Sequence, residues 1–223
     1  TATVRLAQTL GIKNTMHTIN GILHPKKPIY SWWGELSEQW TAIHRRYARI
    51  MTNDAAYWYT ERTNVGVLAQ AAWACGLIAL EEYQAKKAAN LEGDDPRSGR
   101  CDLWLANGSQ GHFIEAKQRY LHLRSSKMIE IINECLGRAY DDAVATRESE
   151  GEHGIGLAFF PIYVPVRSIK PEEMSSELAS LPDRFKETDA EMIAWCFPQE
   201  TRFHKGQGDK NYIPGLVMAG RSI

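Results

Sequence analysis

The run of nine residues from Gly156 to Val164, GLAFFPIYV, constrains the fold of this chain more than any other feature. It is almost continuously apolar. A half-exposed strand alternates polar and apolar residues, whereas a central strand covered on both faces does not. We therefore expect a β-sheet with a layer packed on each side. Pro161 lacks a backbone N–H, so it predicts a bulge or an early end of this strand.

Helical periodicity identifies the layers that cover this sheet. Apolar residues recur at spacings of three and four in three stretches, residues 31–50, 58–75 and 126–147, and residues 171–187 also look helical. Gly76 follows the second stretch, where a glycine commonly ends a helix. One member of the stripe in that second stretch is not apolar but acidic, Glu61.

The remaining patterns predict strands. Residues 77–86 form one candidate, and residues 192–197 and 216–218 are possible later strands. Residues 100–106 and 111–118 alternate and flank Asn107-Gly108-Ser109-Gln110, which is a hairpin signal. The order helix, strand, hairpin, helix, strand predicts an α/β or α+β fold with a mixed central β-sheet flanked by helices.

Length and composition limit the class of protein. A chain of 223 residues, 43% of them hydrophobic, is expected to form a single domain. The four cysteines are widely separated, so neither a disulfide framework nor a structural zinc site is expected, and a reducing cytoplasmic location fits best. No apolar run approaches the roughly 20 residues of a membrane span. The net charge of −1 gives no direct indication of a nucleic-acid partner.

The hairpin places charged residues together. Both two-residue turns, Asn107-Gly108 and Gly108-Ser109, leave Asp102, Glu115 and Lys117 on one face, because side chains alternate along a strand. With the second turn Asp102 faces Glu115 directly, and with the first it lies one diagonal step away. A three-residue loop with a bulge would break this parity.

Two facing carboxylates call for an explanation. Like charges opposite each other destabilise a sheet by roughly 0.2–1 kcal/mol, and Mg²⁺, which prefers oxygen ligands, would relieve the repulsion between Asp102 and Glu115. Lys117 could then orient a water and stabilise a phosphate. The alternative is an ordinary salt-bridged strand, since a chain of this composition is expected to contain one acid-x-Lys triplet by chance.

Taken together, Glu61 on a helix, Asp102 on a strand and Glu115-Ala116-Lys117 on the next strand resemble the PD-(D/E)xK phosphodiesterase superfamily. This superfamily includes many type II restriction endonucleases and the archaeal Holliday-junction resolvases. The resemblance covers about residues 57–165 and leaves a helical N-terminal elaboration at 1–56 and a C-terminal elaboration at 166–223. The core of the family, α-β-β-β-α-β, agrees with the predicted order. Cys101 stands where many members have proline.

The resemblance implies a restriction-endonuclease-like fold and a metal-dependent phosphodiesterase, an endonuclease rather than an exonuclease, acting on nucleic acid, DNA in the first place. Asp102, Glu115 and the backbone carbonyl of Ala116 would bind Mg²⁺, with Mn²⁺ as a substitute. Glu61 would reach the same metal directly or through a water, and Lys117 would position or activate the attacking water. A homodimer would match the two-fold symmetry of a duplex.

Three alternatives stay open at this point. Glu82 could replace Glu61, since it also precedes the hairpin. The chain could be a catalytically silent binding or assembly module with a nuclease fold. It could also be a different α/β enzyme, in which the triplet is accidental.

Overall fold

A computed structural model describes residues 20–23, 27–87, 97–108, 110–146, 153–206 and 208–223. Its helices are α2 (Trp33–Ile50), α3 (Glu61–Ala74), α4 (Met128–Ala145) and α5 (Pro171–Phe185), with short 3₁₀ turns η2 (Pro28–Tyr30), η3 (Ala56–Trp58) and η4 (Val166–Ser168). Its strands are β1 (Asn20–Leu23), β2 (Ile78–Lys87), β3 (Arg97–Ala106), β4 (Gly111–Gln118), β5 (Leu121–His122), β6 (His153–Pro165), β7 (Met192–Cys196) and β8 (Asn211–Ser222). In the part of the chain described, no helix is both long and apolar enough to span a bilayer.

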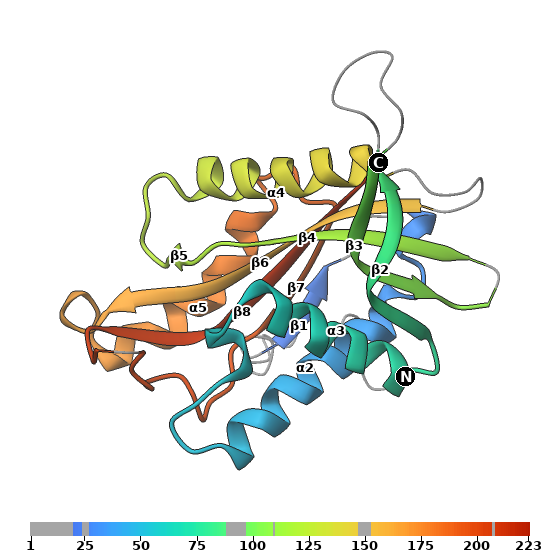
Figure 1. The fold of residues 1–223 in the computed structure, drawn as a ribbon. Helices are drawn as coiled ribbons and strands as arrows, with labels where there is room; N and C mark the ends of the chain where they lie inside the picture. The colour runs from blue at the N-terminus through green and yellow to red at the C-terminus, as the bar shows by residue number, and fades with distance from the viewer. Residues whose placement is uncertain (1–19, 24–26, 88–96, 109, 147–152, 207) are drawn as a thin grey trace, which may run out of the picture.

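The strands form one mixed sheet in the order β1-β7-β8-β6-β4-β3-β2 (Figure 1). Strands β4 and β5 run parallel to β6, and the remaining neighbours are antiparallel. The predicted mixed sheet flanked by helices is therefore confirmed. Strand β1, which periodicity did not predict, pairs with β7, and β8 is longer than the predicted segment.

The apolar run is the central strand β6, and it is covered on both faces. Its residues alternate between two cores: Ile155, Leu157 and Phe159 pack with α2 and α3, whereas Ala158 and Phe160 pack with α4 and α5. In Figure 1, α2 and α3 lie in front of the sheet and α5 lies behind it. The continuous hydrophobicity of the run follows from this double burial.

Pro161 does not end the strand. It pairs with Leu216 of β8, and a register shift follows between residues 162 and 164. On the other side of β6, pairing with β4 ends at Gln118–Phe159 and pairing with β5 begins at Leu121. Pro161 lies opposite the gap between these two ladders, where the parallel pairing of β6 is interrupted.

Helix α2 buries a slightly different face from the predicted one. Trp33, Leu36 and Trp40 are fully buried, as the pattern predicts, but the buried face then continues through His44, and Ile50 is 65% exposed. The indole rings of Trp33 and Trp40 are therefore part of the core.

Candidate active site

The β3–β4 hairpin has the register that a Gly108-Ser109 turn predicts. Leu103 pairs with Ile114, and Ala106 pairs with Gly111. The ladder ends at Leu103, so Asp102 lies just beyond the last pair. The register brings Asp102 to the same level as the triplet, but the predicted cross-strand pair of Asp102 with Glu115 does not form, because the regular alternation of the two strands ends at Leu103.

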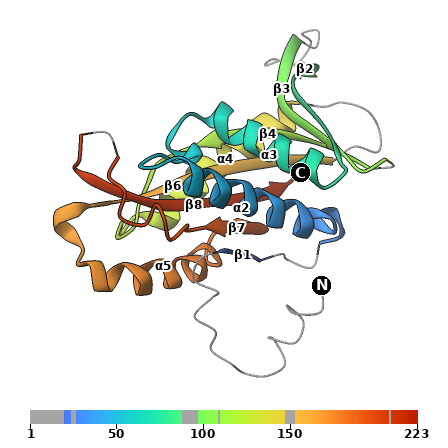
Figure 2. The ribbon, with the colours of Figure 1, turned by 90° about the horizontal axis from the view of Figure 1, so that it is seen from below.

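Strands β2 and β3 bend at Asp102. Their ladder pairs Glu81 with Leu103 and Tyr83 with Cys101 but skips Glu82 and Asp102. Glu82 adopts a left-handed backbone with φ of 53°, a conformation that non-glycine residues rarely adopt and that is often found at functional sites. Beyond this bend the two strands leave the sheet as a separate ribbon (Figure 2).

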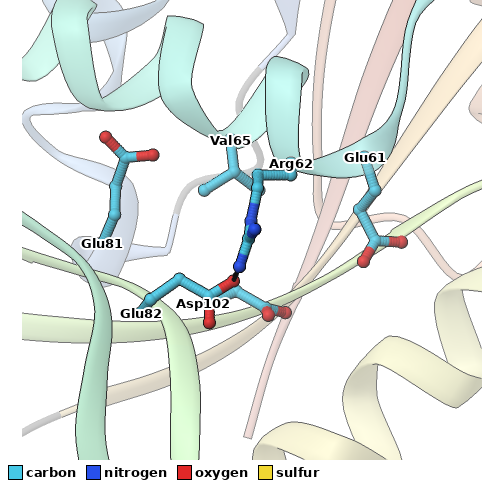
Figure 3. A pocket seen from close by; sticks show the side chains of 6 residues that line it. All are labelled: Glu61, Arg62, Val65, Glu81, Glu82 and Asp102. Carbon is cyan, nitrogen blue, oxygen red and sulfur yellow. Dashed lines mark hydrogen bonds and ion pairs between the residues drawn. The ribbon is translucent and has the colours of Figure 1, made fainter.

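The bend changes the surroundings of Asp102. Its carboxylate accepts a hydrogen bond from the backbone N–H of Ala116, with an O···N distance of 2.7 Å. It also borders a pocket beneath α3, which Glu61, Arg62, Val65, Glu81 and Glu82 complete (Figure 3). The Asp102 carboxylate thus contacts the backbone of the triplet at Ala116, and the Asp102 side chain also borders the pocket beneath α3.

Glu61 is the first residue of α3 and borders the same pocket (Figure 3). Thr60 occupies the N-cap position, but its hydroxyl makes no capping hydrogen bond. Burial raises the pKa of the Glu61 carboxyl; Asp102 raises it further, whereas Lys117 and a backbone hydrogen bond from Gln118 oppose the rise. Glu61 therefore points toward the predicted site and not away from it.

Glu115 and Lys117 share one face of β4, as predicted, and both contact α4. The Thr146 hydroxyl donates to Glu115 Oε1 at 2.6 Å, and the Lys117 ammonium lies 2.5 Å from Asp142 Oδ2. Asp142 and Thr146 are four residues apart, so they lie on one side of the helix end. Asp142 and Thr146, one helical turn apart, thus contact Lys117 and Glu115, which are two residues apart on the strand.

A glycine in the neighbouring strand allows this contact. Gly156 of β6 pairs with Glu115, and a Cβ at Gly156 would lie 2.6 Å from the backbone carbon of Ala139 in α4. Only a residue without a side chain permits so close an approach of helix to sheet. Gly156 therefore sets the distance at which α4 reaches the triplet.

The charges around Lys117 are mainly negative. Burial, the largest single influence, lowers the pKa of Lys117, but Asp142, Glu61 and Asp102 together raise it above its ordinary value. Lys117 thus stays protonated at neutral pH. Three carboxylates interact with this one ammonium, which leaves an excess of negative charge that favours a bound cation.

The donor atoms suit Mg²⁺, although they do not form a ready-made cage. Nowhere in the described ranges do three or more His, Cys, Asp or Glu side chains form a group that could hold a metal ion. Mg²⁺ commonly binds one or two carboxylates and keeps several waters. Asp102 and Glu115 could supply the carboxylates, and the Ala116 carbonyl, which now accepts a hydrogen bond from Lys117 Nζ at 3.1 Å, could supply a third oxygen.

Glu82, the candidate substitute for Glu61, is held by arginines. It lies 2.6 Å from Arg62 and 3.4 Å from Arg100, and the hydrogen bond from Arg62 is the largest influence that lowers its pKa. Because its charge is already compensated, Glu82 is a weaker candidate ligand than Glu61.

Sequence reasoning did not identify Asp142, Thr146 or Gln118 as members of the site. Asp142 and Thr146 lie four residues apart at the end of a predicted helix, which is a weak signal by itself. Gln118 directly follows the triplet. Their contacts to the triplet and to α3 depend on tertiary structure, so periodicity could not reveal them.

The chain matches no protein-family model, and searches of curated proteins and of solved structures also found no match. The resemblance to the PD-(D/E)xK superfamily therefore rests on the quoted residues, their spacing and the order of the elements.

Proposed function

We propose that this protein is a Mg²⁺-dependent nuclease that hydrolyses phosphodiester bonds, in DNA in the first place. The observation that carries the proposal is the group formed by Glu61, Asp102 and Lys117 at the end of β4. These residues come from a helix and two strands, and they are the residue types that a metal-dependent phosphodiesterase requires.

In this proposal Asp102 and Glu115 hold the metal with the Ala116 carbonyl, and Glu61 completes the site directly or through a water. A bound Mg²⁺ would neutralise charge on the phosphate and lower the pKa of a bound water. The excess negative charge around Lys117 supports a cation at this position, because a cation would relieve the repulsion that contributes to the raised pKa of Glu61.

The side chains of the protein supply the rest of the chemistry. Lys117 remains a cation at neutral pH. Its ammonium can donate a hydrogen bond to a lone pair of the attacking water and so orient that water, and it can stabilise negative charge on the phosphate oxygens. Asp142 keeps that ammonium charged and in place. Glu61 is half-buried and has a raised pKa, so in this proposal it accepts a proton from the water.

Cleavage assays test this function. Wild-type protein is expected to cleave plasmid and single-stranded DNA with Mg²⁺ or Mn²⁺. Lys117→Ala is expected to lower the rate by roughly a hundredfold or more, the effect of removing a group that stabilises transition-state charge. Lys186→Ala is the matched control, because Lys186 lies just after α5 and pairs locally with Asp183. Absence of cleavage by the wild type with either metal would refute the proposal.

One observation favours the second candidate, a silent module with a nuclease fold. Three of the four side chains of the predicted site already have a protein partner: the Ala116 N–H for Asp102, Thr146 for Glu115 and Asp142 for Lys117. Titration with Mn²⁺ separates the two functions. A nuclease is expected to bind the metal at this site and to lose metal binding in Asp102→Asn. A silent module is expected to bind nucleic acid without metal and to leave the nucleic acid uncut.

The proposed assembly is a homodimer, because two sites related by a two-fold axis can cut both strands of a duplex. The proposed location is the cytoplasm, where the four cysteines, all free in the structure, would stay reduced.

A further inference from the structure

Gln118, the last residue of β4, joins this strand to the start of α3. Its Nε2 donates to the backbone carbonyl of Tyr59 at 2.7 Å, and its Oε1 accepts from Asn64 Nδ2 at 2.7 Å. Its backbone also lowers the pKa of the Glu61 carboxyl. Two hydrogen bonds and this electrostatic influence thus connect one residue to a single short segment, residues 59–64.

These contacts enclose Glu61. Tyr59 precedes Glu61 by two residues and Asn64 follows it by three, so the side chain of Gln118 holds the chain on both sides of the glutamate. Asn64 is fully buried and cannot easily move. At the other end, Gln118 directly follows Lys117. The distance from the strand to the helix therefore also sets the distance from Lys117 to Glu61.

The first turn of α3 lacks the side-chain cap that commonly stabilises the start of a helix. Thr60 makes no side-chain capping hydrogen bond, although such a bond typically stabilises a helix end. Without that cap, the first turn depends on contacts with neighbouring elements. Gln118 supplies two of them, each to a different side of the turn.

Only an amide of this length satisfies both partners. The Tyr59 carbonyl requires a donor, and the Asn64 amide requires an acceptor. Glutamate offers acceptors only, and methionine, of similar length, offers neither a donor nor a strong acceptor. The presence of glutamine at this position therefore supports a role in holding residues 59–64, which its place next to the triplet alone would not.

We propose that Gln118 is a positioning residue that holds the Glu61 carboxylate beside Lys117 and Asp102. This inference rests on the proposed nuclease function for its kinetic consequence. Its structural part, the attachment of the first turn of α3 to the end of β4, can be measured without any catalysis.

The test uses Gln118→Met, Glu61→Gln and the double variant. Gln118→Met is expected to lower kcat by roughly 10- to 100-fold with little change in KM for DNA, since a misplaced group costs rate more than binding. If Gln118 acts through Glu61, the double variant is no slower than Glu61→Gln alone. Gln70→Met is the matched control, because Gln70 lies exposed on the same helix.

Hydrogen exchange provides a readout that does not depend on activity. The amides of Thr63 and Asn64 bond to the Thr60 carbonyl in the first turn of α3. They are expected to exchange faster in Gln118→Met than in the wild type, and at the wild-type rate in Gln70→Met. Gln118→Glu keeps the acceptor for Asn64 and loses the donor to Tyr59, so its exchange is expected to be intermediate. It also serves as the test if the methionine variant does not fold.

The two proposals fail in different ways. If the wild type does not cleave, the nuclease function is wrong, and hydrogen exchange still decides whether Gln118 holds α3. If the wild type cleaves but exchange is unchanged in Gln118→Met, the positioning role is wrong. Multiplicative losses of rate in the double variant would also overturn it, because they would show that Gln118 acts independently of Glu61.

Discussion

Lys117 carries its charge on a half-buried side chain because Asp142 lies 2.5 Å from its ammonium. Asp142→Asn removes that carboxylate, while burial continues to lower the pKa of Lys117. A lysine is charged below its pKa, so a lower pKa means that the charge is lost at a lower pH. We expect the alkaline limb of the pH–rate profile to move to lower pH in this variant.

The rate of DNA cleavage, the proposed activity, measured from pH 7 to 11 in the variant and the wild type tests this shift. Asp141→Asn is the matched control, because Asp141 is the exposed neighbour on the same helix. An alkaline limb at the same pH in Asp142→Asn and the wild type would mean that Asp142 does not govern the charge of Lys117.

At the scale of elements, the approach of α4 to β6 determines whether the triplet is supported. Gly156→Ala places a Cβ against backbone atoms of α4. These atoms cannot move aside as the end of a long side chain can. We expect a loss of about 1–3 kcal/mol or more in the free energy of unfolding, as for other overpacked cores. If the proposed nuclease function holds, slower cleavage of DNA is also expected, because Asp142 and Thr146 move away with the helix.

Gly137→Ala provides the contrast in urea unfolding. Gly137 lies within α4, and a Cβ there meets nothing within 4 Å. Alanine is the better helix former, so this variant is expected to gain roughly 0.5–1 kcal/mol. Equal stability of the two alanine variants would contradict the close packing of α4 against Gly156.

At the scale of the whole molecule, two buried histidines couple folding to pH. Burial lowers the pKa of His44 to about 3, and burial together with His153 lowers the pKa of His112 to about 4. The unfolded chain, with histidine pKa values near 6.5, therefore binds protons before the folded protein does. Stability is complete above pH 6.5 and falls as the pH decreases toward 4, by about 1.4 kcal/mol per pH unit for each histidine.

Urea unfolding between pH 4 and 7 measures this slope. His44 packs edge-on against Trp40 and Tyr57, and both of its ring nitrogens are buried without a hydrogen-bond partner in the described structure. His44→Phe keeps the ring and removes the proton site, so it is expected to halve the slope and to stabilise the protein. An unchanged slope would show that protonation of His44 does not limit acid stability.

The local patterns of the chain determined its elements. Periodicity and the apolar run predicted α2, α3, α4 and β6, and turn chemistry predicted the β3–β4 hairpin with two possible registers, because each of these depends on neighbours in sequence. The structure has the register of the Gly108-Ser109 turn. The shared face of Glu115 and Lys117 follows in the same way, since side chains alternate along any strand.

Only the tertiary structure decided what surrounds those residues. The hydrogen bonds from Asn64 to Gln118 and from Thr146 to Glu115 join positions 54 and 31 residues apart, and the bend at Asp102 depends on how β2 leaves the sheet. Spacing in sequence carries no information on such contacts, because they form only when the layers pack. The sequence thus named the residues of the candidate site, and the packing of α3 and α4 against β4 determined their partners and their charge.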